Sequence, residues 1–123
     1  MRVNYAIVFV SEMDKSVAFY RDLLGLPLRF QSSHWTEFAT EGATLALHLG
    51  RKPDGLHGIA QDKAPGTCRP GLGVPDLDSF HKRMVTQGVV CLEEPKVVSG
   101  SRIAQYADPD GLAISVSEHT SGG

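Results

Sequence analysis

The sequence consists of two halves that repeat the same order of patterns. Segments 10–14 (VSEMD) and 74–78 (VPDLD) each end an apolar run and begin a helix-like run, which stops at Gly25 or at Gly88. In both halves a hydrophobic segment follows, and then a turn made of an acidic residue and a glycine precedes the last apolar run. A duplicated supersecondary unit is typical of a pseudo-symmetric sheet. We therefore expect the functional site in a cleft that the two halves share.

Each half has the pattern of a βαβββ module. Alternating apolar residues predict strands, and apolar residues three or four positions apart predict helices. The first module is expected to contain a helix over 14–24 and strands over 3–10, 26–31, 35–40 and 43–49. The second is expected to contain a helix over 78–87 and strands over 68–74, 89–93, 101–107 and 112–118.

Both predicted helices carry start and stop signals. Asp14 and Asp78 are expected as N-caps, because an aspartate side chain can accept hydrogen bonds from the first-turn N–H groups. Gly25 and Gly88 suit the left-handed residue that follows a helix. The stripes expected to face the core are Val17, Tyr20, Leu23 and Leu24 in the first helix, and Phe80, Met84 and Val85 in the second.

Length and composition favour one compact domain. The chain has 123 residues, of which 41% are hydrophobic, enough to bury a core. We expect the first module over residues 1–50 and the second over 67–119. Residues 51–66 are rich in glycine and proline and show little periodicity, which is typical of a connector.

Charge and cysteine content narrow the class of protein. A formal net charge of -2 without a block of lysine or arginine argues against a nucleic-acid partner. No apolar run is long enough to cross a bilayer and no signal-peptide pattern is present, so a soluble, cytoplasmic protein is expected. Cys68 and Cys91 form no CxxC spacing and are expected to be reduced and mostly buried.

Alternation along the strands separates a face that packs on helices from a second face of mixed character. This second face is expected to carry Tyr5, Ile7, Phe9, Thr44, Ala46, His48, Arg69, Gly71, Gly73, Ala113, Ser115 and Ser117. Trp35 should share a face with Glu37, and Ile103 with Gln105. A mixture of apolar and polar groups is typical of a ligand cleft.

Three side chains on that face have alternative interpretations. Arg69 could hold a carboxylate or phosphate at two points, beside glycines that let a ligand approach the backbone, or it could pair with an internal acid such as Glu37. Trp35 is a stacking surface or an ordinary core or interface aromatic. His48 is an acid or base near neutral pH or a partly solvated histidine at a strand end.

Two segments carry a family resemblance. The run FYRDLLGL at 19–26 and the turn DPDG at 108–111 resemble the vicinal oxygen chelate superfamily, which includes glyoxalase I, extradiol dioxygenases and bleomycin-resistance proteins. The resemblance covers essentially the whole chain. It implies an α+β fold in which two βαβββ modules form a curled, U-shaped mixed sheet with helices on its outer face, commonly completed by a homodimer.

The resemblance also implies where a metal would be held. Enzymes of this superfamily typically bind one divalent metal through His and Glu side chains on four strands, and the matching positions here are Tyr5, Ala46, Arg69 and Ser115. Tyr5 and Arg69 each lie five residues before Val10 and Val74, and Ala46 and Ser115 each lie four residues after Gly42 and Gly111. Arginine repels cations, alanine has no donor atom and neutral serine is a weak ligand. We therefore expect no conventional divalent metal and no other cofactor.

Two functional classes follow. In the first, the protein binds a small aromatic or acidic molecule without a metal, as bleomycin-resistance proteins do, with a site made of Tyr5, Trp35, His48, Arg69, Gln105 and Ser115. In the second, it is a glyoxalase-like lyase, isomerase or thiol transferase whose displaced or metal-free site uses His48, Tyr5 and Glu37. Loss of binding in Arg69→Ala would indicate the first class, and loss of turnover with binding retained in His48→Ala would indicate the second.

Overall fold

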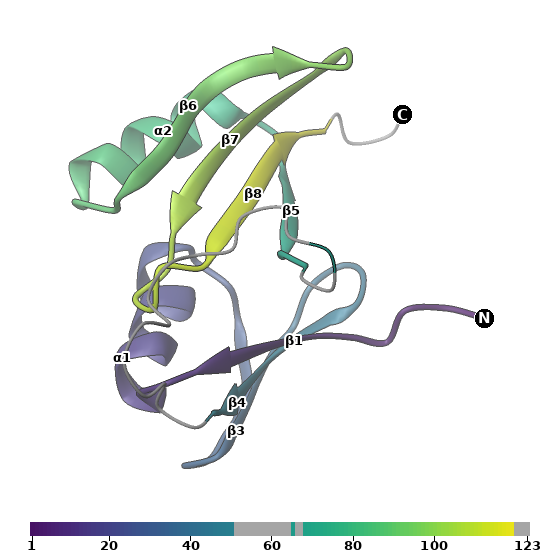
Figure 1. The fold of residues 1–123 in the computed structure, drawn as a ribbon, viewed down its shortest axis with the longest axis vertical. Helices are drawn as coiled ribbons and strands as arrows, with labels where there is room; N and C mark the ends of the chain where they lie inside the picture. The colour runs from purple at the N-terminus through teal and green to yellow at the C-terminus, as the bar shows by residue number, and fades with distance from the viewer. Residues whose placement is uncertain (51–64, 66–67, 120–123) are drawn as a thin grey trace. The chain divides into compact units, whose positions relative to one another are not determined.

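The structure is a computed structural model that describes residues 1–50, 65 and 68–119 (Figure 1). It divides the chain into two compact units, Met1–Gly58 and Ile59–Gly123. The expected connector, residues 51–66, lies outside the described residues except at position 65. Each unit is a module with its own sheet and helix.

The first module has the expected βαβββ order. Its elements are β1 (Tyr5–Val10), α1 (Met13–Ala18), a π-helical turn η1 (Phe19–Leu23), β2 (Leu28–Gln31), β3 (Trp35–Phe38) and β4 (Thr44–Leu49). The strands form one mixed sheet in the order β1-β4-β3-β2. In this sheet β1 runs parallel to β4, and the other neighbours are antiparallel.

The second module repeats this topology. Its elements are β5 (Gly71–Val74), α2 (Leu77–Thr86), β6 (Cys91–Val98), β7 (Ser101–Ala107) and β8 (Ala113–Glu118), and its sheet has the order β5-β8-β7-β6. Helix α2 contacts β6, β7 and β8 on one side of the sheet (Figure 1). Two mixed four-stranded sheets with few helices confirm the predicted α+β class and the βαβββ modules.

Strand register confirms the internal repeat residue by residue. In the first module Glu37 lies opposite Ala46, and in the second Gln105 lies opposite Ser115. Two residues farther along each strand, Trp35 lies opposite His48 in the first module, and Ile103 lies opposite Ser117 in the second. The expected face partners, Trp35 with Glu37 and Ile103 with Gln105, are therefore correct.

The predicted bounds of two strands in the second module were wrong. Strand β6 continues to Val98, well beyond the predicted 89–93, because it forms a hairpin with β7 that closes at Ser99 and Gly100, both with positive φ. Pro95 does not interrupt β6, since an edge strand does not need every N–H group for pairing. Strand β5 begins only at Gly71, three residues later than predicted.

The predicted N-caps Asp14 and Asp78 were also wrong, because both helices begin earlier. Glu12 is the N-cap of α1 and makes no side-chain capping bond. Asp76 is the N-cap of α2, where its carboxylate accepts a hydrogen bond of 3.1 Å from the Ser79 N–H. Asp78 instead forms an ion pair of 2.7 Å with Arg102 on β7.

The first five residues of the segment FYRDLLGL, Phe19–Leu23, form the second half of the first helix. The Leu24 N–H donates to the carbonyl of Phe19, five residues earlier, at 3.0 Å, which is the hydrogen-bond pattern of a π-helical turn. Gly25 then adopts a φ of 89°, as expected for the residue that ends a helix. The wider turn belongs to a segment that buries both Phe19 and Tyr20.

Each module has its own core beneath one face of its sheet. Tyr20, Phe38 and Leu47 are fully buried in the first module, and Leu77, Met84, Tyr106, Ile114 and Val116 in the second. The expectation that Val85 faces the core was wrong, because it is 58% exposed. Leu77 takes that role instead, since Leu77, Phe80 and Met84 lie on one side of α2 at spacings of three and four residues.

Tyr106 links β7 to α2 by a hydrogen bond in the core of the second module. Its hydroxyl lies 2.9 Å from Nδ1 of His81 on α2. Burial raises the pKa of Tyr106 to about 12. The neutral phenol is therefore the form that the folded module holds.

The two cysteines differ from the prediction that both are mostly buried. Cys68 is exposed and Cys91 is half-buried, and neither is in a disulfide. Burial raises the pKa of the Cys91 thiol, which disfavours its reactive thiolate form.

The DPDG segment is a structural turn between β7 and β8. The Asp108 carboxylate is buried and accepts hydrogen bonds of 2.9 Å from the N–H groups of Asp110 and Leu112. Gly111 provides the positive φ of 86° that the turn requires. This turn directs the chain into the central strand of the second sheet.

Asp108→Ala should lower the free energy of unfolding by about 2 kcal/mol, because two backbone N–H groups lose their acceptor. Urea denaturation measures the change. Glu94→Ala is the control, since it removes an exposed carboxylate from β6 and should change stability by less than about 0.5 kcal/mol. Equal effects of the two substitutions would contradict this interpretation of the turn.

Candidate ligand-binding site

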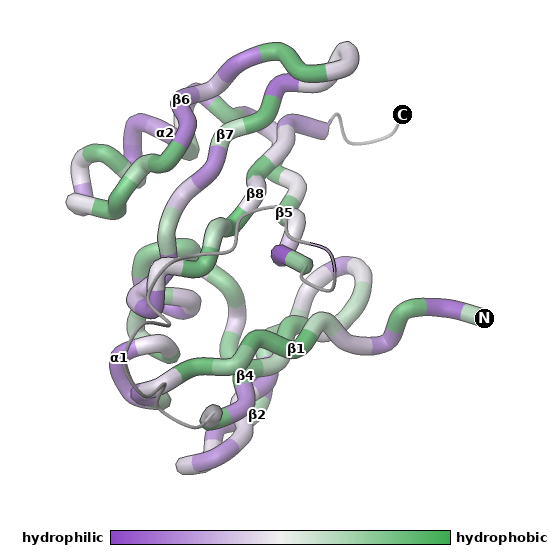
Figure 2. Tube along the Cα trace, in the orientation of Figure 1, coloured by the Kyte–Doolittle hydropathy of each residue, from purple (hydrophilic) through white to green (hydrophobic). Residues whose placement is uncertain are grey.

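The exposed face of the first sheet is rich in large apolar side chains. On β1, Tyr5, Ile7 and Phe9 are 47%, 47% and 66% exposed, and they alternate with the buried Val8 and Val10. Figure 2 shows that β1 is hydrophobic along nearly its whole length, including the residues that do not face the core. The predicted separation of two faces is correct for this strand, and its outer face is the first feature of a candidate site.

Four rings from three adjacent strands gather on this face, and we call them the aromatic cluster: Tyr5 and Phe9 from β1, His48 from β4 and Trp35 from β3. The ring centroids of Trp35 lie 6.0 Å from those of both Tyr5 and His48, at interplanar angles of 66° and 87°. Phe9 lies 5.4 Å from His48. The two contacts of Trp35 are edge-to-face and that of Phe9 is tilted, and such arrangements are favourable and leave ring faces for a planar ligand.

Glu37 fixes the indole of Trp35 in this cluster. The Trp35 Nε1–H donates to Glu37 Oε2 at 2.8 Å, and Arg29 Nη2 donates to Glu37 Oε1 at 3.0 Å. The hydrogen bond from Trp35, followed by that from Arg29, lowers the pKa of Glu37. Glu37 is therefore ionised at neutral pH and is a weak proton acceptor.

Arg29 is a site residue that the sequence analysis did not identify. Strand β2 has a register shift between Leu28 and Phe30, so Arg29 reaches both Glu37 and the hydroxyl of Thr44 on β4. A bulge changes the direction of a side chain relative to simple alternation. No pattern in the sequence signals this shift.

His48 is exposed at the end of β4. Its Nδ1 lies 2.8 Å from the carbonyl oxygen of Leu49, and because a carbonyl only accepts, Nδ1 carries the proton of the neutral ring. Nε2 is then the ring nitrogen with a lone pair. His48 can accept a hydrogen bond from a ligand at this atom.

Ala46 lies at the centre of the face, fully buried between Ile7 on β1 and Glu37 on β3. It stands at one of the four positions that the family resemblance implied for metal ligands and has no donor atom. Tyr5, Arg69 and Ser115 at the other positions do not supply the missing nitrogen or carboxylate donors. The described residues contain no group of three His, Cys, Asp or Glu side chains that could hold a metal ion. These residues do not fit a divalent metal.

The remaining predicted site residues belong to the second module. Gln105 and Ser115 are half-buried and lie opposite each other on β7 and β8, and Arg69 is half-buried two residues before β5. Gly71 has open space where a side chain would be, which fits close approach of a ligand. A cleft that combines these residues with the aromatic cluster stays a prediction.

Gly73 departs from the expectation that it is open to a ligand. A β-carbon at this position would lie 2.5 Å from Cδ2 of His119, so the histidine ring occupies that space. The His119 N–H also donates to the Val74 carbonyl at 2.9 Å. Gly73 thus allows the chain after β8 to pack against β5.

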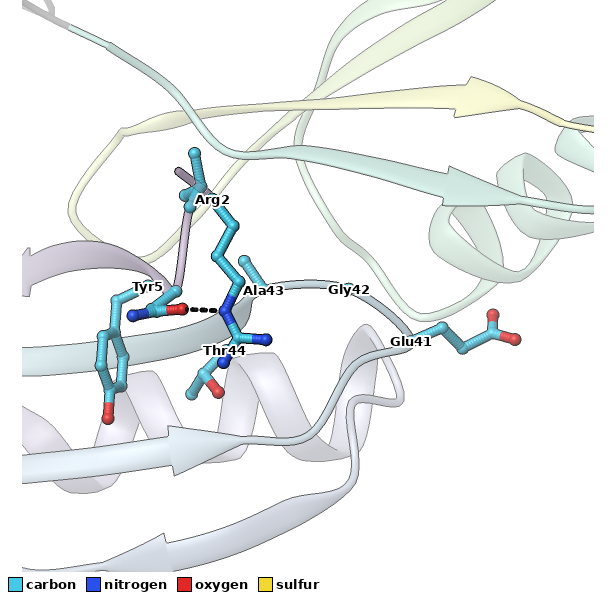
Figure 3. Close-up of a pocket in the computed structure, with 8 residues that line it drawn as sticks. Arg2, Tyr5, Glu41, Gly42, Ala43 and Thr44 are labelled. Carbon is cyan, nitrogen blue, oxygen red and sulfur yellow. Dashed lines mark hydrogen bonds between the residues drawn. The ribbon is translucent and has the colours of Figure 1, made fainter.

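A hollow of about 560 Å³ opens beside the aromatic cluster, at the start of β1 and the turn before β4 (Figure 3). Tyr5 belongs to both features, and the hollow is also lined by Arg2, Asn4, Glu41, Gly42 and Thr44. The Thr44 N–H donates to the Asn4 carbonyl at 2.9 Å, which joins the two segments. The sequence analysis missed this hollow, because only the parallel pairing of β1 with β4 brings residues 2–5 and 41–44 together.

Comparison with known proteins agrees with this architecture. The sequence profile of the Glyoxalase/Bleomycin resistance protein/Dioxygenase superfamily matches residues 2–116. The uncharacterized protein YraH of Bacillus subtilis (strain 168) is 29% identical, over 94% of this chain and 97% of that protein. The chain therefore belongs to the Glyoxalase/Bleomycin resistance protein/Dioxygenase superfamily, as the two sequence motifs predicted.

Two solved structures resemble the chain over nearly its whole length. A superfamily member from Sphaerobacter thermophilus DSM 20745 has 25% sequence identity and a TM-score of 0.74, covering 97% of this chain and 98% of that one. TnmS3, an antibiotic binding protein from Streptomyces sp. CB03234, has 27% identity and a TM-score of 0.71, covering 98% and 97%.

Trp35 is the only tryptophan, so its fluorescence reports directly on the candidate site. Because the pKa of Glu37 lies below its ordinary value of 4.5, the carboxylate and its bond to Trp35 should persist at and above that pH. The contribution of this bond to stability is present above 4.5 and is lost as pH falls through the lowered pKa. We expect a change in Trp35 emission with a midpoint below pH 4.5, absent in Glu37→Gln.

Far-UV circular dichroism over the same pH range separates this local change from acid unfolding. A midpoint above pH 4.5 in the folded protein would contradict the assignment of Trp35 and Arg29 as partners that stabilise the charged carboxylate.

The donor chemistry of the four implied positions predicts that the protein retains no stoichiometric metal. The untagged protein is incubated with nickel, zinc, manganese or iron, dialysed and examined by elemental analysis. A molar equivalent of any of them would show that the assigned positions Tyr5, Ala46, Arg69 and Ser115 are wrong.

Proposed function

We propose that the protein binds a small aromatic molecule on the exposed face of its first sheet and holds it without chemical change. The observation that carries this proposal is the aromatic cluster, which adjacent strands assemble around the small side chain of Ala46. Ala46 itself is fully buried among its neighbours, so the contact surface is made by the exposed side chains around it. The surrounding rings provide faces on which a planar ligand can stack.

Burial of exposed apolar surface is the main source of affinity in this proposal. Ile7 and Phe9 together with Tyr5 form a row that is about half exposed. Covering one such side chain, which is already about half buried, contributes roughly 1 kcal/mol. The hydrogen bond from Trp35 to Glu37 holds the indole in place, so a ligand pays little to order that ring.

The family supports the same assignment. TnmS3, one of the solved structures that this chain resembles, is an antibiotic binding protein. An aromatic antibiotic is therefore the first ligand class to test, and sequestration of such a compound is the role we propose. Arg69, Gln105 and Ser115 are proposed as further contacts from the second module, and binding should weaken in Arg69→Ala if Arg69 contributes.

A metal-independent enzyme that uses His48, Tyr5 and Glu37 has less support. Glu37 is engaged by Trp35 and Arg29, which lower its pKa and make it a poor base. His48 remains the group to test, because Nε2 can accept a proton. Under this alternative His48→Ala would abolish turnover and leave binding intact.

A homodimer is a further part of the proposal. Strands β1 and β5 lie at the edges of their sheets, and a second copy of the chain is one way to cover such edges. Light scattering coupled to size exclusion should return twice the chain mass at micromolar concentration. A monomer alone would contradict this part.

The neutral probe 2-naphthamide tests the aromatic site. Phe9→Ser should weaken its binding about tenfold, because an exposed ring of the cluster is lost. Val97→Ser is a matched control on β6, since Val97 is 68% exposed and Phe9 is 66% exposed. Ligand-observed NMR titration measures both affinities. Equal affinities in the two variants would contradict the proposed site.

Aromatic antibiotics are then screened for thermal stabilisation of the protein. We expect at least one to raise the midpoint of unfolding, and mass spectrometry after long incubation should recover it unchanged. Conversion of the compound by the protein, abolished in His48→Ala, would replace the binding function with the enzymatic alternative.

A further inference from the structure

We propose that the hollow beside Tyr5 is an anion subsite in which Arg2 holds a carboxylate, so that the preferred ligand is an aromatic carboxylic acid. This inference rests on the proposed function, because the aromatic cluster would hold the ring. The acidic group of the ligand then binds residues of the first module rather than Arg69.

Arg2 is oriented for this role by a neutral partner, Asn4. Its Nε–H donates to Asn4 Oδ1 at 2.7 Å, which fixes one edge of the guanidinium. In Figure 3 the side chain of Arg2 extends toward Thr44, between the start of β1 and the turn before β4. In the described part of the chain Arg2 forms no ion pair with a carboxylate, so its two terminal nitrogens can bind a carboxylate at two points.

Thr44 supplies a second donor to the same space. Its hydroxyl oxygen accepts a hydrogen bond from Arg29, which leaves the hydroxyl proton to donate to a ligand. The charge of Arg29 is largely balanced by Glu37, at 3.0 Å. Arg2 is thus the cation of the hollow whose charge is left for a ligand.

Glu41 is the one acidic residue on the lining, and its charge opposes an anion. Figure 3 shows that its side chain points away from Arg2, Tyr5 and Thr44. The carboxylate of a ligand would therefore meet Arg2 and Thr44 first. A cation would have to approach Arg2 to enter the same space, which makes a basic ligand unfavourable.

Tyr5 connects this subsite to the aromatic cluster. The residue lines the hollow, and its ring lies 6.0 Å from that of Trp35. An aromatic ring that stacks beside Tyr5 would place a directly attached carboxylate at the entrance of the hollow. One ligand of this kind would use both features.

Two isosteric probes test the subsite: 2-naphthoate, which is anionic, and 2-naphthamide, which is neutral. The wild-type protein should bind the naphthoate about tenfold more tightly, because hydrogen bonds to a charged group are stronger than neutral ones. Arg2→Gln should remove this preference and leave the affinity for naphthamide unchanged. Asn4→Ala should reduce the preference several-fold, because Arg2 loses the group that orients it.

Two arginine controls complete the experiment. Arg21→Gln removes an exposed arginine that pairs with Asp22, far along the chain from the subsite, and should keep the tenfold preference. Arg69→Gln tests the other candidate for the anion. Loss of the preference in Arg69→Gln but not in Arg2→Gln would overturn the inference.

The outcomes separate this inference from the proposed function. Equal affinity of the wild-type protein for both probes would overturn the anion subsite and leave the aromatic site standing. Binding of neither probe would overturn both. Loss of preference in Arg2→Gln but in neither other arginine variant would establish the subsite. All variants are substitutions at exposed or half-buried positions that should fold.

Discussion

The placement of the last strand of each module at the centre of its sheet is the constraint on which the rest of the structure depends. Strand β4 pairs in parallel with β1 and antiparallel with β3, and β8 does the same with β5 and β7. A side chain at the middle of β4 is therefore flanked on both sides, so Ala46 is fully buried while Tyr5 on the edge strand is 47% exposed. The candidate site consists of the side chains that β1 and β3 place around Ala46.

The same arrangement explains why the central position matters for chemistry. In a strand, residues two apart share a face, so Thr44, Ala46 and His48 form one row that Ile7 and Phe9 border on one side and Trp35 and Glu37 on the other. A donor side chain at position 46 would stand at the middle of this row. The buried alanine there has no donor atom, and aromatic, apolar and polar side chains surround it, which suits a ligand held by contact and stacking better than one activated by a cation.

The charged side chains near Ala46 and Tyr5 are of two kinds, those that pair with each other and one that does not. Arg29 and Glu37 neutralise one another and, through the indole N–H, hold Trp35. Among the described residues the hydrogen-bond partner of Arg2 is the amide oxygen of Asn4, and Arg2 lines the hollow to which Tyr5 also contributes. A paired charge positions an aromatic ring, whereas a charge without a counter-ion can recognise an anionic group of a ligand.

Much of the fold follows from the sequence alone, because the two repeats carry the same periodicity and the same turn residues. The patterns predicted the βαβββ order, the two faces of β1 and the shared faces of Trp35 with Glu37 and of Ile103 with Gln105, which the element order, burial and register confirm. These properties are local, since alternation and turn chemistry depend on neighbours within a few residues. Errors arose where a local pattern fits two neighbouring positions, since Val85 adjoins the buried Met84 but is exposed, and the N-cap of α2 lies at Asp76 rather than at Asp78.

Some contacts of the candidate site could be predicted from the sequence and others could not. The sequence by itself determined which side chains share a strand face, so Tyr5, Trp35, Glu37 and His48 could be predicted together. Only the tertiary structure decided that Arg29 pairs with Glu37, through a bulge in β2, and that Arg2 and Thr44 line one hollow. The physical reason is that strand register joins β1 to β4, about forty residues apart, and that a bulge redirects Arg29. Both depend on the whole sheet rather than on any short pattern.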